Sequence, residues 1–378
     1  MDKQKARSYF PHLSNEMIYM NHAATGPMST LVKEKLDSFI LDKCENKIDD
    51  YLGYLKEAEK VKQGIAAMIN SGPDRMAFTD STTNGLNYLA QGLCLKKSDR
   101  IILNDIEFPA NVYPFMNLQK EGIEIDFVKS SNGIVTAEDV ISNIKPETKL
   151  VAISMVQFLS GYRVDLEKIG KICREKGIIF SVDAIQGLGA LRLDIVKDKI
   201  DFISCGTQKW LLGLQGLAFI YISKELQERI NPKYVGWLGV QDAWNLLDYK
   251  LELKSSSEGL QTGTVSVIGV YALSAALDLF NQFGFDEIEK EVIANTKYFM
   301  KKLDDIGLKP LLLNQPDERL SGIVSIRSDE SQKYFEALSS EKIFTAVREG
   351  VLRISPHFYN TTDDIDRVVE VLRNTQKT

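Results

Sequence analysis

The stretch "LEKIGKICREKGIIFSVDAIQGLG", residues 166–189, contains the pattern that decides the fold. Its first half repeats apolar residues at helical spacing. Its second half opens with the apolar run "IIFSV", which is typical of a strand buried on both faces. A helix followed at once by a buried strand is the repeating unit of a parallel α/β sheet.

The same alternation runs from about residue 60 to about residue 262. Helical spacing recurs in "AEKVKQGIAAMIN" (58–70) and "STTNGLNYLAQGLC" (81–94). Strands are predicted at 74–80, 100–105, 123–129, 149–157, 177–185, 201–206 and 216–223. The pattern predicts a large α/β domain over residues 16–262, with a mostly parallel sheet covered by helices.

The pattern changes after residue 262. Two long helical stretches, 263–284 and 287–307, precede two weak strands at 308–314 and 321–328, and the chain ends with a helix over 362–375. We expect a smaller α+β C-terminal domain over residues 263–378, with the N-terminal segment 1–15 packing on it.

Composition excludes several classes of protein. The chain has 378 residues, 44% hydrophobic and 26% charged, as expected for two globular domains. A net charge of −6 without a basic stripe argues against a nucleic-acid partner. No apolar run is long enough for a membrane span, so we expect no membrane partner and a cytoplasmic protein. Four cysteines and three histidines lack the spacing of a metal site, and we expect none.

Ligands of a parallel α/β sheet bind outside the carboxyl ends of its strands, where this chain places polar and aromatic residues. Thr82 and Thr83 open a helix whose hydroxyls and free N–H groups suit a phosphate, although a plain N-cap is the alternative. Phe108 either lies flat against a planar cofactor or fills the core. Gln157 ends the strand predicted at 149–157.

Two charged residues end the remaining central strands. Asp183 is followed three residues later by Gln186. A carboxylate buried at this position needs a positively charged partner, for which a protonated ring nitrogen would serve, or it caps a helix. Lys209 follows the strand "DFISCG", and partial burial favours its neutral, nucleophilic amine. A phosphate site, a ring stacker, a ring-nitrogen partner and an amine nucleophile together describe pyridoxal 5′-phosphate.

These motifs resemble the class V aminotransferases, which include cysteine desulfurases, selenocysteine lyases, kynureninases and isopenicillin N epimerases. The resemblance covers nearly the whole chain. Its motifs are "YMNHAATGPMS" (19–29), "STTNGLN" (81–87), "EFPANV" (107–112), "VQFLSGYRVDL" (156–166), "VDAIQGLG" (182–189), "GTQKWLLG" (206–213), "TGTVS" (262–266) and "LRISPHFYNTTDDID" (352–366). It implies the fold of the pyridoxal-phosphate-dependent transferases, aspartate aminotransferase-like, and pyridoxal 5′-phosphate as cofactor.

The resemblance also implies roles for individual residues. Lys209 is the Schiff-base lysine, and Asp183 keeps the ring nitrogen protonated. Arg353 clamps the substrate α-carboxylate, with Asn21 and Ala23 also at the substrate. The remaining cofactor contacts fall on Thr82 and Thr83 (phosphate), Phe108 (ring), Gln157 and Gln186 (ring hydroxyl), Gln208 (phosphate) and Thr264, which reaches the phosphate from the neighbouring subunit of a homodimer with shared active sites.

The resemblance implies action on a small-molecule amino acid through an external aldimine, and transamination is the first expectation. A C–S lyase and an amino-acid epimerase are the alternatives. A persulfide-forming desulfurase is disfavoured because "TAVREGVLRISPHFYN" (345–360) has no cysteine and the last cysteine is Cys205. Tyr234, Trp237 and Trp244 line either a pocket or a dimer face.

Overall fold

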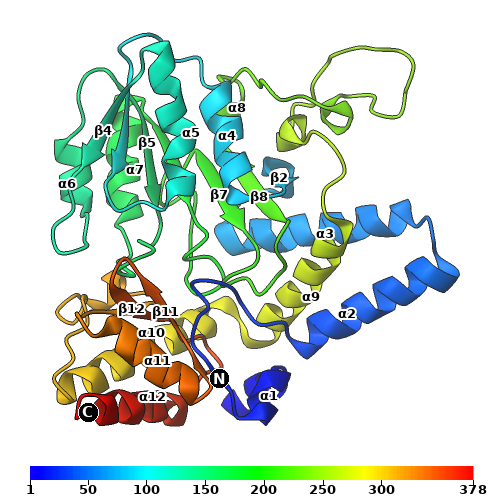
Figure 1. Ribbon diagram of the computed structural model, residues 1–378. Helices are drawn as coiled ribbons and strands as arrows, with labels where there is room; N and C mark the ends of the chain where they lie inside the picture. Colours follow the sequence, from blue (N-terminus) through cyan, green and yellow to red (C-terminus); the bar gives the residue numbers. More distant parts are fainter. Residues whose placement is uncertain (378) are drawn as a thin grey trace.

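The computed structural model describes residues 1–377 and is built around a seven-stranded sheet (Figure 1). The strands lie side by side in the order β2-β8-β7-β6-β5-β3-β4. Their bounds are β2 Met76–Thr79, β3 Arg100–Asn104, β4 Glu124–Val128, β5 Thr148–Ser154, β6 Ile179–Asp183, β7 Phe202–Gly206 and β8 Ala218–Ile222.

The sheet is mostly parallel, as predicted. Strands β4, β3, β5, β6 and β7 run parallel to one another, whereas β8 runs antiparallel to both β7 and β2. Every residue of β6, β7 and β8 is buried, which explains their continuous apolar runs. The carboxyl ends of β3, β5, β6 and β7 therefore meet at one edge of the sheet.

Helices cover both faces of this sheet, so consecutive strand residues belong to different cores. Ile179 of β6 belongs to the same hydrophobic cluster as Leu89 and Phe115, whereas Phe180 belongs to the cluster of Ile65 and Ile169 on the other face. The helices of this part are α3 Tyr51–Ile69, α4 Thr82–Gly92, α5 Tyr113–Met116, α6 Ala137–Ser142, α7 Leu166–Lys176 and α8 Lys224–Gln227.

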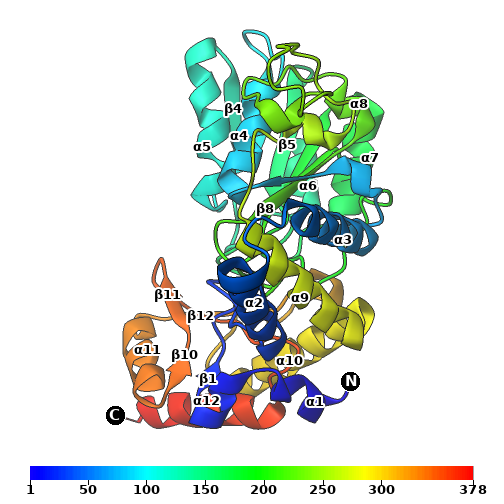
Figure 2. The ribbon, with the colours of Figure 1, turned by 90° about the vertical axis from the view of Figure 1, so that its right-hand side faces the viewer.

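The C-terminal part forms a second, smaller body below the large sheet (Figures 1 and 2). It contains a three-stranded antiparallel sheet in the order β11-β12-β9. Its elements are α9 Val267–Phe283, α10 Phe285–Asp305, β9 Val324–Arg327, α11 Ser331–Ser340, β10 Ile343–Phe344, β11 Ala346–Arg348, β12 Val351–Ile354 and α12 Thr362–Thr375.

One predicted element of this body is wrong. Residues 308–314 form no strand and touch the sheet only at an isolated bridge between Pro310 and Ile326. Proline lacks the backbone N–H that a sheet ladder requires. Only the neighbouring Leu311 N–H bonds to this edge, at 2.9 Å from the Ser325 carbonyl.

The N-terminal segment lies against the C-terminal body. It contains α1 Lys3–Ser8, and β1 Ile18–Tyr19 pairs with β10. The Lys3 ammonium donates to the Phe358 and Asn360 carbonyls, and the Arg7 guanidinium donates to the Asp364 carboxylate at 2.6 Å. We keep the division into domains 16–262 and 263–378 as a proposal.

Two segments project from this core (Figure 1): helix α2 Thr30–Leu41 with the start of α3, and the long connection over residues 229–256. Helix α9 packs against both α2 and α3. Within residues 1–377, no single helix has the length and hydropathy to cross a membrane, and α9 with α10 satisfies that test only as a pair bent by 81°.

Candidate active site

The site lies where the carboxyl ends of β3, β5, β6 and β7 meet the start of α4. The Thr82 hydroxyl oxygen accepts a hydrogen bond of 2.8 Å from the Gly206 N–H, which joins the first turn of α4 to the end of β7. Thr82 is buried and Thr83 is exposed. The structure thus brings Thr82 next to the end of β7, three residues before Lys209, and the phosphate contacts of Thr82 and Thr83 stay a prediction.

Lys209 lies in the turn after β7, with its ammonium 5.6 Å from the centre of the Phe108 ring. Burial lowers the pKa of Lys209 to about 8, and the Asp183 carboxylate partly opposes that shift. A lysine with this pKa has a substantial neutral fraction near pH 7.5, so its amine is available as a nucleophile.

Asp183 ends β6 and is 2% exposed. Burial raises its pKa to about 7, and the nearby Glu107 carboxylate adds to the rise. The Lys209 charge and a hydrogen bond of 3.0 Å from the Ile185 N–H favour the ionised form. Asp183 is therefore an acid that shares its proton readily with a base of similar strength.

Glu107 is a buried carboxylate that the sequence analysis did not single out. Its oxygens accept hydrogen bonds from the Asn104 amide at 2.6 Å, the Asn111 amide at 3.1 Å, the Ser154 N–H at 2.8 Å and the Ser154 hydroxyl. These bonds join the ends of β3 and β5 and fix the backbone next to Phe108. A carboxylate between Ile106 and Phe108, at the end of an apolar strand, is the sequence signal that could have revealed it.

Residues 21–26 form the floor of the site. The Gly26 N–H donates to the Gln208 carbonyl at 2.7 Å, and the Ala23 N–H donates to the Ser355 hydroxyl at 3.0 Å. This loop therefore binds both the turn of Lys209 and the strand of Arg353. Ala23 contributes backbone atoms only, and Gln208 contributes its carbonyl.

Gln186 and Gln157 differ in how many of their side-chain amide atoms are already hydrogen-bonded. The Gln186 amide donates to the Ala23 carbonyl at 3.0 Å, and its oxygen accepts from the Trp210 indole N–H at 3.0 Å. A cofactor contact of Gln186 would therefore use the second lone pair of that oxygen. Gln157 is 1% exposed, and neither polar atom of its side chain has a partner among the described residues.

Arg353 lies on β12 and is buried without an acidic partner among residues 1–377. One terminal nitrogen donates to the Phe158 carbonyl at 2.8 Å, and the buried Nε has no partner. Burial, with help from the Arg348 charge, lowers the pKa of Arg353 to about 10. A buried guanidinium with a free donor face is a site for an anion, and a carboxylate matches its planar fork.

Two predicted residues are placed at the edge of this group. The Oδ1 of Asn21 is buried and has no partner in the described part of the chain. Thr264 is exposed in the segment before α9 and forms no recorded hydrogen bond with the Lys209 group. Contacts and charge interactions within the chain therefore connect Lys209 with Phe108, Asp183 and Arg353, and the roles of the other predicted residues stay a prediction.

Comparison with known proteins gives the family. The model of the class V aminotransferases matches residues 18–368. The chain belongs to the class V aminotransferase family. This family depends on pyridoxal 5′-phosphate.

Several relatives within the class V family match nearly the full chain. An uncharacterized aminotransferase of Bacillus subtilis (strain 168) is 27% identical over 370 residues, which cover 97% of this chain and 96% of that protein. A probable cysteine desulfurase of Pyrococcus abyssi (strain GE5 / Orsay) is 28% identical over 389 residues, with 97% and 96% covered.

Solved structures confirm the predicted class V fold. The apo structure of a cysteine desulfurase from Thermococcus onnurineus NA1 has a TM-score of 0.89 at 24% identity, covering 99% of this chain and 98% of that one. A cystine C–S lyase in complex with its product cysteine persulfide has a TM-score of 0.89 at 21% identity, covering 97% and 99%.

The residues present fit the cofactor of the class V family. The unpartnered Gln157 amide offers polar contacts that the protein alone leaves unused, and the buried Asp183 carboxyl accepts one hydrogen bond, from the Ile185 N–H. The start of α4 offers N–H groups to a phosphate, beside Gly206, where an added Cβ would lie 3.2 Å from the Thr82 hydroxyl and 2.6 Å from the Gln208 amide oxygen. Lys209 supplies the amine.

Proposed function

We propose that this chain is a pyridoxal-phosphate-dependent enzyme that acts on an amino acid, and that the reaction is transamination. One observation carries the proposal: Lys209, with a pKa of about 8, lies beside the Asp183 carboxyl and over the Phe108 ring, near a buried guanidinium of Arg353 that lacks an acidic partner. An amine nucleophile, a proton-sharing acid, a flat apolar surface and a carboxylate site are what that chemistry requires.

Pyridoxal phosphate, when bound, supplies an electron sink that stabilises a carbanion at the substrate Cα. The residues of the chain do the rest. The Lys209 amine holds the cofactor and moves a proton at the substrate Cα. Asp183 keeps a proton on the ring nitrogen, and Arg353 orients the substrate through its α-carboxylate. Phe108, which is 47% exposed, would cover one face of the ring.

The structure gives a reason to keep persulfide chemistry out of the proposal. Strands β11 and β12 are joined by the two residues Glu349 and Gly350, both with positive φ, which is the signature of a type I′ turn. This segment is therefore too short to carry a cysteine-bearing loop. Cys205 is fully buried, and burial raises the pKa of its thiol, so it is a poor nucleophile.

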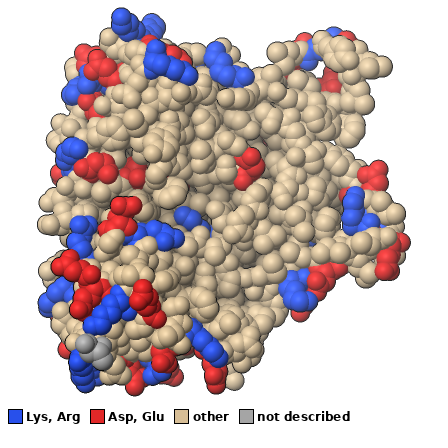
Figure 3. Space-filling view, viewed as in Figure 1, with Lys and Arg blue, Asp and Glu red and all other residues tan. Residues whose placement is uncertain are grey.

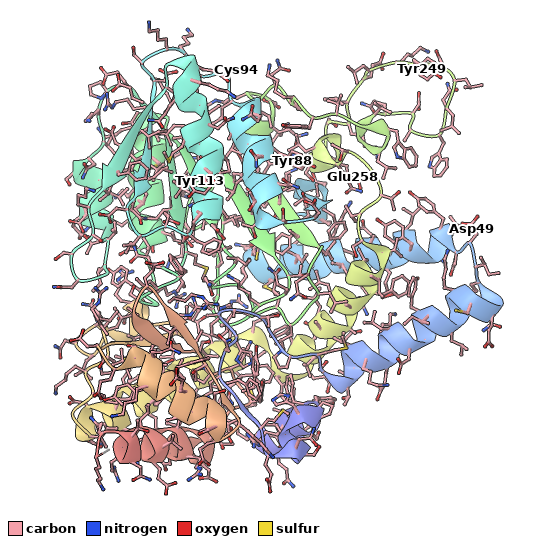
Figure 4. The ribbon with its side chains drawn as sticks, in the orientation of Figure 1. Asp49, Tyr88, Cys94, Tyr113, Tyr249 and Glu258 are labelled. Atoms are coloured by element: carbon pink, nitrogen blue, oxygen red, sulfur yellow. The ribbon has the colours of Figure 1, made fainter. Side chains whose placement is uncertain are left out.

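We further propose a homodimer. Large apolar side chains are exposed on α2, α3 and the projecting connection, and the middle of the face in Figure 3 carries few charged side chains. Tyr249, 89% exposed, stands on that connection away from the body (Figure 4). Leu247 is 84% exposed, and Trp237 and Trp244 pack edge to face with ring centres 5.4 Å apart. Exposed apolar surface of this kind marks an interface, and Thr264 would reach a partner's site across it.

The experiment follows the absorbance of the purified, cofactor-loaded protein with single amino acids, and assays pyruvate and sulfide in parallel. Conversion to the pyridoxamine form supports transamination. Release of a 2-oxo acid and sulfide without that conversion replaces it by a C–S lyase reaction, and loss of optical purity alone replaces it by epimerisation. A Lys209→Ala variant that keeps full turnover refutes the whole proposal.

A further inference from the structure

Arg348 lies on the same face of the small sheet as Arg353. Ala346 pairs with Arg353 and Arg348 pairs with Val351 across the β11–β12 ladder. Directly paired residues of an antiparallel sheet point to the same face, and so do residues two apart. The two arginines are therefore diagonal neighbours, with Cα atoms about 7–8 Å apart.

The Arg348 charge has no acidic partner among residues 1–377. Its guanidinium is exposed, and the hydrogen bond recorded for it goes to the carbonyl of its own neighbour Val347, at 2.9 Å. The charge nevertheless acts on the site, because it lowers the pKa of both Lys209 and Arg353. The charges of Arg348, Arg353 and Lys209 thus act on one another.

Under the proposed function, each of the other charged groups of the site already has a binding partner. Arg353 binds the α-carboxylate of the substrate, Lys209 holds the cofactor and Asp183 contacts the ring nitrogen of the cofactor. The positive charge of Arg348 remains, beside two like charges that repel it. A second anion bound there relieves this repulsion, and the guanidinium offers that anion a planar pair of donors.

We propose that the substrate is an amino acid whose side chain ends in a carboxylate or another small oxyanion, and that Arg348 binds this group while Arg353 binds the α-carboxylate. The inference rests on the proposed function. The spacing of the two arginines fits a substrate whose two anionic groups are separated by a few bonds, such as aspartate, glutamate or cysteine sulfinate.

The chain offers a matched control. Arg327 of β9 pairs with Val351, so it lies on the same face and in the same row as Arg348, on the other side of β12. It is also exposed. Its charge is not among those that shift the pKa of Lys209 or Arg353.

The experiment measures kcat/KM of the holoenzyme for anionic amino acids and for their neutral isosteres asparagine and glutamine. The wild type should prefer the anionic members. Arg348→Met should lower kcat/KM for the anionic members roughly 10- to 100-fold, the value of one charge-assisted contact, and leave the neutral ones within about 2-fold. Arg327→Met should change neither. Comparison of kcat/KM for aspartate and glutamate with kcat/KM for cysteine sulfinate shows whether the second anionic group is a carboxylate or a sulfinate.

A second readout does not depend on turnover. Glutarate should raise the melting temperature of the wild-type holoenzyme more than butyrate does, and Arg348→Met should abolish that difference. Equal losses for anionic and neutral substrates in Arg348→Met, or no wild-type preference between glutarate and butyrate, would overturn the inference while leaving the proposed function intact. If no amino acid changes the cofactor spectrum but glutarate is still preferred, the proposed function fails and the anion site stands.

Discussion

Replacement of Arg353 tests how the substrate is oriented. One terminal nitrogen is engaged with the Phe158 carbonyl, so Nε and the other terminal nitrogen are left as a two-donor fork. Each hydrogen bond to a charged group contributes about 1.5–3 kcal/mol. Arg353→Lys keeps the charge but offers one bond at most, and we expect kcat/KM to fall roughly 10- to 150-fold. Arg353→Met removes both bonds, and we expect a loss of roughly 10²- to 10⁴-fold.

The assay compares each amino acid with the amine that lacks the α-carboxylate. Wild-type protein should discriminate strongly between the two, and Arg353→Met should lose most of that discrimination because the amine never used the fork. Cofactor absorbance and the melting temperature serve as controls for folding. If Arg353→Met slows both compounds equally, the guanidinium has a structural role and the reasoning is refuted.

Three further outcomes are expected. In cofactor-free protein, the labelling of Lys209 by an amine reagent should rise with pH and have its midpoint near pH 8, because burial lowers the pKa of Lys209. Asp183→Asn should move this midpoint to lower pH, since it removes the negative charge that opposes the shift. A midpoint near pH 10 in the wild type would contradict the burial of the Lys209 amine. In the wild type, hydrogen-bond donors of Asn104 and Asn111 face the carboxylate oxygens of Glu107, and Glu107→Gln would turn an amide N–H toward such donors. The substitution should therefore lower the free energy of unfolding, measured in urea, by about 1–3 kcal/mol. An unchanged urea midpoint would show that the four hydrogen bonds of Glu107 contribute little to stability. Leu247→Glu should shift the protein from dimer to monomer in light scattering, whereas Val196→Glu, at another exposed apolar residue, should not; a monomeric wild type would refute the dimer.

Much of the fold follows from local sequence. Strands β6, β7 and β8 can be predicted from their continuous apolar runs, because both faces of the sheet are covered there. Helix α12 begins and ends at the residues that its helical spacing predicts. The failure at 308–314 has a local cause in Pro310. The strand order and the antiparallel direction of β8 depend on contacts between distant segments, which no short window contains.

The site follows from sequence only in part. The rule that ligands bind at strand ends pointed to Asp183, which ends β6, and to Lys209 and Phe108, which lie within four residues after β7 and β3. The same rule could have pointed to Glu107, but the hydrogen bonds that Glu107 accepts could not be predicted, since its donors lie at three separate places along the chain. The position of Arg348 beside Arg353 could not be predicted from sequence either, because it depends on the register of the β11–β12 hairpin.

The two-residue turn between β11 and β12 also defines where this enzyme can be remodelled. Residues Glu349 and Gly350 close a hairpin whose strands carry Arg348 and Arg353, and the turn lies outside the sheet ladder. Lengthening a surface loop costs little free energy, about 0.6 kcal/mol for each doubling. An inserted segment would therefore extend the hairpin of Arg348 and Arg353 at low cost, and we expect this turn to be the point at which the surroundings of Arg353 accept new side chains.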